Sequence, residues 1–233
     1  MKLMDSLHLS KRLATVAKYV PDDARMADIG SDHAYLPANL ALNQRIDFAI
    51  AGEVAKGPFQ NAQAEISGHQ LTKQIEARLA DGLAAIELSD RIDTITIAGM
   101  GGTLISDILE QGKSKLSNIS RLVLEPNVGS EIVRTWLVDN YFEITAEEIL
   151  SEDNHVYEII VAEPVDLKAI YSDQEILFGP FLLKEKSAAF NEKWQSQINH
   201  LNEAIKQMEQ ASKVPSEKIE EFKREISLIE EGL

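Results

Sequence analysis

The chain of 233 residues contains no cysteine, and this absence sets the first limit on its chemistry. Disulfide bridges, thiolate metal ligands and a cysteine nucleophile are all excluded, which agrees with a reducing compartment. No stretch approaches the roughly 20 apolar residues of a membrane-spanning helix, and the first residues lack an apolar run of signal-peptide length. We therefore expect a soluble, cytoplasmic protein with no membrane association and no metal.

Positive charge is also scarce, because 23 Lys and Arg face 38 Asp and Glu, giving a net charge of -15. Broad affinity for nucleic acid is disfavoured, since phosphate binding depends largely on Lys and Arg that displace counterions. Residues 1–19 are the most basic segment, with Lys2, Lys11, Arg12 and Lys18 against Asp5. The simpler interpretation of this segment is a solvated helix face, although a local patch can still attract phosphate.

Short apolar runs alternate with segments of helical periodicity over the first 140 residues. The expected strands are 25–29, 46–53, 74–79, 92–100 and 121–125. The first expected helix begins after its N-cap, Ser10, and ends before Pro21. Further helices are expected at 34–43, 57–66, 102–110 and 130–140. This alternation predicts a parallel sheet with helices on both faces. Two further β-rich runs, 142–150 and 156–162, predict an antiparallel hairpin that ends the sheet.

The last part of the chain has a different pattern. Residues 163–179 contain Pro and Gly and predict a linker with at most one short helix. Apolar side chains then repeat at intervals of three and four, first from Phe190 to Met208 and again from Ile219 to Leu233. We expect two helices that fold back as an antiparallel coiled coil, so that residues 1–163 form one domain and 164–233 form the linker and a second domain.

The segment 28–37, DIGSDHAYLP, follows the first expected strand and carries the strongest indication of a ligand. Gly30 permits a sharp turn, and the helix that begins near Ala34 or Tyr35 offers unpaired amides. Asp28 and Asp32 would repel a phosphate, which favours a ligand with positive charge. The alternative for this segment alone is an ordinary strand-to-helix turn with an N-capping residue.

Three later strand ends strengthen the ligand interpretation. Glu53 follows Asp28 by about 25 residues, where dinucleotide-type folds place a carboxylate on a ribose diol. Asp81 and Gly82 end the third strand, and Gly101 and Gly102 end the fourth. These positions together predict a site for a nucleoside-containing cofactor.

Five motifs in this order resemble the TrmK family, bacterial S-adenosylmethionine-dependent tRNA methyltransferases that modify N1 of adenine 22. They are DIGSDHAYLP, AGEVAKGPFQNA at 51–62, DGL at 81–83, IAGMGG at 97–102 and LEPN at 124–127. The resemblance covers essentially the whole chain, and it implies a class I, Rossmann-like methyltransferase domain followed by a C-terminal coiled coil.

The resemblance also implies the cofactor contacts. Asp28 would bind the amino group of the methionine moiety, Glu53 the ribose hydroxyls and Asp81 the exocyclic amine. The full set of implied S-adenosylmethionine contacts is Asp28, Gly30, Ser31, His33, Leu36, Glu53, Val54, Asp81, Gly82, Leu83 and Ala98. Asp32 stands where the general class has a second glycine.

The segment after the fourth strand fits a ring nitrogen as methyl acceptor. Enzymes that methylate an exocyclic amine often carry Asn or Asp followed by Pro-Pro and an aromatic residue there, whereas this chain has Gly99, Met100 and Gly101. Adenine N1 already presents a lone pair, so alignment and exclusion of water are the main requirements. We interpret Asp32 as the carboxylate that favours the cationic product and Tyr35 as a contact of the base.

A separate set of residues is expected to contact the tRNA. They are Lys2, Lys11, Arg12, Asn127, Lys184, Lys186 and Lys193. The alternative for the lysines near the coiled coil is that they only solubilise it. A projecting hairpin could grip a tRNA by its shape and backbone, and the expected assembly is a monomer.

Two other functions remain open from the residues alone. A nicotinamide-dependent oxidoreductase would also use an acid after the second strand, although Asp28 and Asp81 suit S-adenosylmethionine better than a pyrophosphate. A non-catalytic RNA- or protein-binding module with a vestigial cofactor pocket is the other. Loss of cofactor binding and methyl transfer in Asp28→Ala would distinguish an enzyme from such a module.

Overall fold

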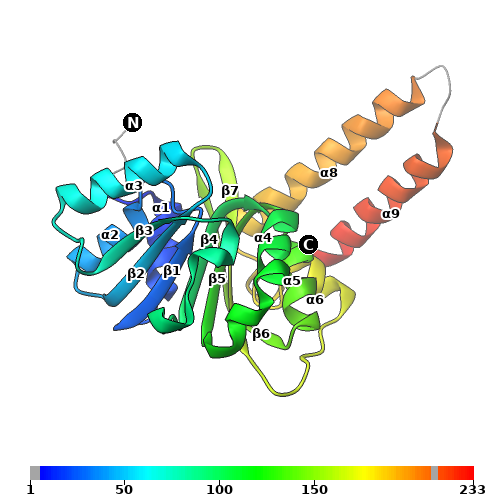
Figure 1. The fold of residues 1–233 in the computed structure, drawn as a ribbon. Coiled ribbons are helices and arrows are strands. Elements are labelled where there is room, and N and C mark those ends of the chain that lie inside the picture. Colours follow the sequence, from blue (N-terminus) through cyan, green and yellow to red (C-terminus); the bar gives the residue numbers. More distant parts are fainter. Residues whose placement is uncertain (1–5, 211–214) are drawn as a thin grey trace.

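A computed structural model describes residues 6–210 and 215–233, and a seven-stranded sheet forms its centre (Figure 1). The strand order is β3-β2-β1-β4-β5-β7-β6, with β1 to β5 parallel and β7 antiparallel to both β5 and β6. The strands are β1 (Ala24–Ile29), β2 (Ile46–Glu53), β3 (Ile75–Leu79), β4 (Thr94–Gly101), β5 (Arg121–Val128), β6 (Phe142–Glu152) and β7 (His155–Pro164). The predicted doubly wound sheet with an antiparallel end is confirmed.

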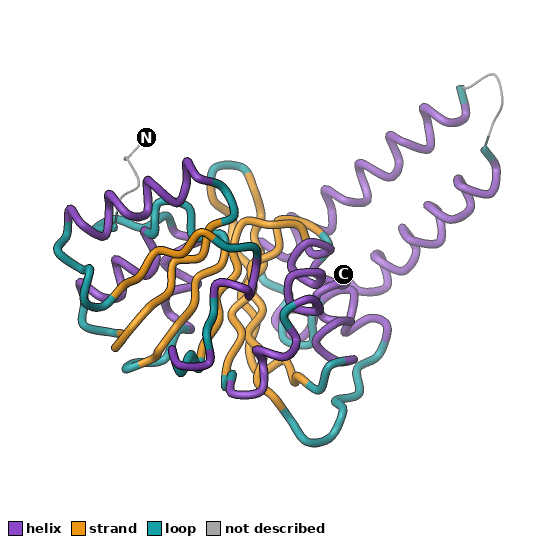
Figure 2. The backbone as a smooth tube through the Cα atoms, in the orientation of Figure 1, coloured by secondary structure: helices purple, strands orange, loops and turns teal. Residues whose placement is uncertain are grey.

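Helices cover both faces of this sheet, as Figure 2 shows. One buried cluster joins the sheet to α1 (Lys11–Tyr19), α2 (Tyr35–Leu42) and α3 (Lys56–Gly68). The other joins it to α4 (Gly102–Gln111), α5 (Ser130–Asp139) and the short 3-10 helices η1 (Gly82–Ala85) and η3 (Lys113–Asn118). A third 3-10 helix, η2 (Leu88–Asp90), precedes β4. The 3-10 helices were not predicted, since three to six residues carry too little periodicity.

Local chemistry explains where several elements begin and turn. Ser10 caps α1, since its side chain accepts a hydrogen bond from the backbone N–H of Leu13. The turn between β6 and β7 is only Asp153 and Asn154, and both have positive φ, as a tight two-residue hairpin turn requires. The predicted connection at 151–155 was therefore too long, because both strands continue almost to the turn.

The C-terminal part consists of α6 (Asp173–Phe178), α7 (Leu182–Glu185), α8 (Ala188–Glu209) and α9 (Ser216–Gly232). α8 and α9 run side by side in opposite directions and project from the sheet (Figure 1). Apolar side chains of both helices pack in one buried cluster, which includes Phe190, Trp194 and Ile198 of α8 and Ile229 of α9. The single helix predicted within 163–179 is α6, whereas α7 was not predicted. No helix in residues 6–210 or 215–233 has the length and apolarity to cross a bilayer.

A group of four charges joins the helical pair to the sheet, and we call Arg134, Glu147, Glu158 and Lys193 the junction cluster. The first three are buried, and the side chain of Lys193 is 30% exposed. Arg134 on α5 is fully buried and bonds Glu147 of β6 at 2.7 Å and Glu158 of β7 at 2.9 Å. Lys193 of α8 reaches the second oxygen of Glu158 at 2.6 Å. Two positive and two negative charges balance at this junction, so their burial leaves no net charge.

Candidate functional site

A pocket of about 220 Å³ opens at the carboxyl ends of β1 and β4. Its wall is made by α1, the segment after β1, the start of α2 and the end of β4. The lining residues are Arg12, Leu13, Asp28, Gly30, Ser31, Asp32, Tyr35, Leu36, Ala98 and Gly99. The direction in which successive strands are added to the sheet reverses at β1, which lies between β2 and β4. Open α/β sheets bind ligands at such a point. The structure thus brings together most residues of the predicted first motif with the predicted glycine segment.

Asp28 is the most deeply placed acid of this pocket, with 4% exposure. Its carboxylate accepts hydrogen bonds from the hydroxyls of Ser31 at 2.5 Å and Thr96 at 2.6 Å. Burial raises its pKa above the ordinary value, while the two hydroxyls and the nearby charge of Arg12 act in the opposite direction. A cationic group that entered the pocket would favour the ionised form of Asp28.

The segment between β1 and α2 closes over the neighbouring strand end. Gly30 has φ +70°, Asp32 +43° and Ala34 +56°, so three of five residues have left-handed backbone. The backbone N–H of Asp32 donates to the carboxylate of Glu53, which ends β2 and is 5% exposed. Burial is the largest cause that raises the pKa of Glu53, with the Asp32 amide opposing it. Glu53 is therefore held by a backbone group and has no cationic partner among the described residues.

The glycine segment at the end of β4 forms the other wall. Gly99 has φ +81° and interrupts the pairing of β4 with β5, since Ala98 pairs with Glu125 and Met100 with Pro126. A Cβ on Gly30 would lie 2.1 Å from Cε of Met100, so the Met100 side chain packs directly against the turn after β1. Glycine suits position 30 because of its positive φ, and a larger residue there would also require the flexible end of the Met100 side chain to move.

Glu125 is a site residue that the sequence interpretation left without a role, although it stands in the quoted LEPN motif. It is fully buried, forms an ion pair with Arg12 and accepts a hydrogen bond from the N–H of Gly99 at 2.9 Å. Burial raises its pKa, and the charge of Arg12 opposes this. The pattern that singled out Asp28 and Glu53, an acid at a strand end, would also have indicated Glu125.

The remaining predicted cofactor residues are not among those that line the pocket, and they differ in exposure. His33 and Tyr35 stack with ring centroids 4.9 Å apart. Val54 is 69% exposed beyond the end of β2, and Asp81 is exposed before η1. Leu83 instead lies in the core at 2% exposure, so only its backbone remains for the predicted contact with an adenine ring.

The structure changes the interpretation of two predicted RNA contacts. Arg12 pairs with Glu125, and Lys193 belongs to the junction cluster, so both charges are matched inside the chain. Lys186 donates to the carbonyl of Leu233 at 3.2 Å and Lys184 lies over the ring of Phe181, whereas Asn127 donates to the carbonyl of Gly99 at 2.7 Å. Lys2 lies outside the described residues. Lys11 remains exposed on α1.

The donor set of the pocket fits S-adenosylmethionine better than a phosphate ligand or a metal. Asp28 and Asp32 line the pocket, and the buried carboxylates of Glu53 and Glu125 bond to the backbone of its wall residues Asp32 and Gly99. Arg12, the guanidinium in the wall, is already paired. A pyrophosphate would meet repulsion here, whereas a sulfonium and an ammonium would be attracted. Within the described residues, no group of three or more His, Asp or Glu is arranged to bind a metal ion.

Comparison with known proteins agrees with this chemistry. A curated tRNA (adenine(22)-N(1))-methyltransferase of Bacillus subtilis is 44% identical over 98% of this chain and 98% of its own length. A Streptococcus pneumoniae structure in complex with S-adenosyl-L-methionine is 44% identical, covers 97% of this chain and 100% of its own, and superposes with a TM-score of 0.90.

A Mycoplasma capricolum TrmK structure in complex with S-adenosyl-homocysteine is more distant. It is 30% identical, covers 96% of each chain and has a TM-score of 0.83. The profile of the family described as TrmK, tRNA (adenine(22)-N(1))-methyltransferase, matches residues 26–231. The chain described here therefore belongs to the TrmK family.

Proposed function

We propose that this protein transfers a methyl group from S-adenosylmethionine to N1 of adenine 22 in tRNA. The observation that carries the proposal is Asp28, a buried carboxylate at the switch point of the sheet with hydroxyls but no paired cation around it. In a chain of this family, that carboxylate has the chemistry to bind the ammonium group of the donor. The same excess of acids disfavours a nicotinamide dinucleotide.

The donor site is proposed to extend from Asp28 along the ends of β1, β2 and β3. Gly30, Ser31, His33 and Leu36 would surround the methionine part, and Ala98 would lie beside it. Glu53 would accept from the ribose hydroxyls with the oxygen that the Asp32 amide does not occupy, and Val54, Asp81, Gly82 and Leu83 would meet the adenine.

When bound, S-adenosylmethionine supplies a methyl carbon whose bond to sulfur breaks as the N1 lone pair forms the new C–N bond. The electron pair of the broken bond stays on sulfur, and the positive charge moves to the adenine. No base is needed to remove a proton first, so the protein must align the two reactants and keep water out. The Gly99, Met100 and Gly101 segment would form the surface on which the base lies.

Asp32 and Tyr35 are the side chains proposed to act on the base. The Asp32 carboxylate is 69% exposed at the rim of the pocket, where it can approach an incoming cation. Tyr35 lines the same pocket and already stacks on His33. A flipped base could extend this stack, since aromatic side chains often receive unstacked bases.

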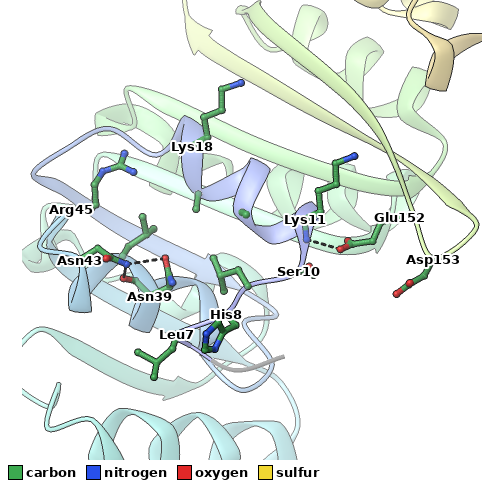
Figure 3. A pocket seen from close by; sticks show the side chains of 14 residues that line it. Leu7, His8, Ser10, Lys11, Lys18, Asn39, Asn43, Arg45, Glu152 and Asp153 are labelled. Atoms are coloured by element: carbon green, nitrogen blue, oxygen red, sulfur yellow. Dashed lines mark hydrogen bonds between the residues drawn. The ribbon is translucent and has the colours of Figure 1, made fainter. Parts of the chain in front are cut away.

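A second pocket beside the donor site is the proposed contact for the tRNA backbone (Figure 3). It has a volume of about 1300 Å³ and lies between α1, α2 and the turn of β6 and β7. Its lining includes the cations Lys11, Lys18 and Arg45, the acids Glu152 and Asp153, and the side-chain amides of Asn39 and Asn43. Lys18 pairs with Glu148 at 2.7 Å and Arg45 pairs with Asp22, whereas the ammonium of Lys11 contacts the carbonyl of Ser151 at 3.4 Å. Helix α1 separates the two pockets, because Arg12 and Leu13 line one and Lys11 and Ala14 line the other. RNA held in the larger pocket would thus lie one helix away from the donor.

Incubation with tRNA transcript and methyl-labelled S-adenosylmethionine tests the proposed function. We expect label in the RNA and a reverse-transcription stop at adenine 22, because a methyl group on N1 blocks pairing. A transcript with guanine at position 22 is the matched control and should remain unlabelled. Label at another base, in protein or in a small molecule would contradict the assignment. With tRNA as substrate, we also propose the cytoplasm as the compartment and the monomer as the working form.

A further inference from the structure

The end of β4 is fixed by two side chains of the neighbouring strand. Glu125 accepts from the N–H of Gly99 at 2.9 Å, and Asn127 donates to the carbonyl of the same residue at 2.7 Å. Both contacts come from β5, and they occur where Gly99 bulges out of the strand pairing with φ +81°. A bulge leaves its backbone groups outside the ladder, so these two side chains supply the partners that the ladder does not.

The guanidinium of Arg12 joins this arrangement from helix α1. It forms an ion pair with the Glu125 oxygen that also accepts from Gly99, and it lies 5.4 Å from the ring centroid of Tyr157. Helix α1 is itself anchored, because the carboxylate of Glu152 accepts the backbone N–H groups of Lys11 at 2.6 Å and Arg12 at 2.9 Å. Arg12 therefore has a fixed place in the wall of the 220 Å³ pocket.

A guanidinium in this wall creates an electrostatic problem for the reaction. The proposed donor carries a sulfonium, and the methylated adenine carries a positive charge, so an unpaired Arg12 would repel both the bound donor and the product. Glu125 is the only acid among the described residues that forms an ion pair with Arg12. Its other oxygen, Oε1, is buried without a hydrogen-bond partner among the described residues.

We propose that Glu125 is a positioning residue for methyl transfer, which cancels the charge of Arg12 beside the sulfonium and fixes the Gly99 bulge beneath the target base. This inference rests on the proposed function and adds a residue to its site. It explains why a carboxylate stands at a fully buried place, since an ionised Glu125 cancels the charge of Arg12 while it accepts from the N–H of Gly99.

Calorimetric affinities for S-adenosylmethionine and S-adenosylhomocysteine test the charge part, since the two ligands differ by the methyl group and the sulfonium charge. In Glu125→Gln the amide oxygen still accepts from Gly99, but Arg12 becomes uncompensated. We expect affinity for S-adenosylmethionine to fall about tenfold, and for S-adenosylhomocysteine less than about threefold. The ratio of the affinity for S-adenosylmethionine to that for S-adenosylhomocysteine therefore falls in Glu125→Gln. This ratio should rise in Arg12→Met, and it should return to the wild-type value in the double variant.

Equal losses for both ligands, or a double variant no better than Glu125→Gln alone, would show that Glu125 has only a packing role. If wild type binds neither ligand, the proposed function itself fails. If wild type binds both ligands and the variants keep its preference between them, only the proposal for Glu125 fails. If Glu125→Gln does not fold, Arg12→Met provides the test. In this variant S-adenosylmethionine must bind more tightly relative to S-adenosylhomocysteine than it does in wild type.

Asn127→Ala tests the bulge part without touching the buried charges, since Asn127 is exposed. We expect kcat to fall about tenfold while the affinity for S-adenosylmethionine stays within about twofold, because only the alignment of the base surface changes. Asn127→Ser, which keeps a shorter donor, should recover part of kcat. An Asn127→Ala variant with wild-type kcat would overturn this part of the proposal.

Discussion

Two groups of charges, each with three buried members and one partly exposed cation, differ in how completely their members are paired. In the junction cluster, Arg134 bonds both glutamates and also the carbonyls of Ile176 and Leu177, and the second oxygen of Glu147 accepts the N–H of Phe181. The other group is the site cluster, which we define as Arg12, Asp28, Glu53 and Glu125. It has one cation for three acids, and one Glu125 oxygen has no partner among the described residues.

The comparison indicates that completeness of pairing separates a structural role from a binding role. The balanced junction cluster connects α5, β6, β7 and α8 and needs nothing further. Burial raises the pKa of Asp28, Glu53 and Glu125, as it does that of Glu147 in the junction cluster, but of the two groups the site cluster alone has an excess of negative charge. A cationic ligand would offset that excess, which fits the proposed donor.

Removal of the central cation of the junction cluster should have the largest effect. In Arg134→Met, two buried glutamates lose their partner, and we expect the free energy of unfolding to fall by about 3–5 kcal/mol. Chemical denaturation followed by circular dichroism measures this. The control is Lys168→Met, which breaks the exposed ion pair with Asp139 and should change stability by less than about 1 kcal/mol. Equal losses in both variants would remove the distinction between the clusters.

Acid should weaken the junction cluster through Glu158. The charges of Lys193 and Arg134, opposed by burial, lower the pKa of Glu158 from 4.5 to about 2. Because the pKa is lower in the folded protein than in the unfolded chain, the ionised Glu158 stabilises the fold at pH values above about 4.5. This stabilisation, on the order of 3 kcal/mol, is lost as the pH falls from about 4.5 toward 2. The stability gap between wild type and Glu158→Gln should therefore shrink over that range. A gap that does not depend on pH would contradict this assignment.

Glu53→Gln sharpens the comparison within the site cluster. A charged acceptor of ribose hydroxyls is worth about 1.5–3 kcal/mol, so affinity should fall about tenfold to a hundredfold. The loss should be equal for S-adenosylmethionine and S-adenosylhomocysteine, because both carry the ribose, in contrast to the selective effect expected for Glu125→Gln. Isothermal calorimetry measures both ligands, and a loss confined to one of them would refute the ribose assignment.

The smallest effect is expected at the exposed lysines of the larger pocket. Lys11→Ala and Lys18→Ala should each raise KM for tRNA about threefold and reduce the salt dependence of binding, while kcat and donor affinity stay unchanged. Lys113→Ala, an exposed lysine on the opposite face of the sheet, is the matched control. If Lys113→Ala weakens tRNA binding as much, the effect comes from net charge and not from this pocket.

The sequence predicted the sheet and the order of its elements, because strands and helices leave a local pattern of apolar residues. It predicted β5 too short, ending at Glu125, since proline usually ends a strand. Pro126 is tolerated because it pairs opposite Met100 at the bulge, where the ladder is already irregular. The Arg12–Glu125 pair was missed because its members are 113 residues apart and only tertiary packing brings them together.

The same reason explains why the sequence did not predict the ion-pair partner of Lys193, which it left as either an RNA contact or a solubilising residue. Its charge is matched by Glu158, an acid on β7 that sequence periodicity places on a strand but cannot assign to a partner. Helical spacing predicted the apolar contact between α8 and α9, since that pattern is local. The charges that connect these helices to the sheet are long-range and carry no such pattern.

The thermal stability of Asp28→Asn with and without S-adenosylmethionine tests the central claim most directly. Because burial raises the pKa of Asp28, its ionised carboxylate lowers the stability of the folded protein at neutral pH. The neutral side chain of Asp28→Asn removes this loss of stability. We predict that the variant without ligand unfolds at the wild-type temperature or above it, and that only wild type is stabilised by the donor. A variant that unfolds several degrees lower and is still stabilised by the donor would contradict the account.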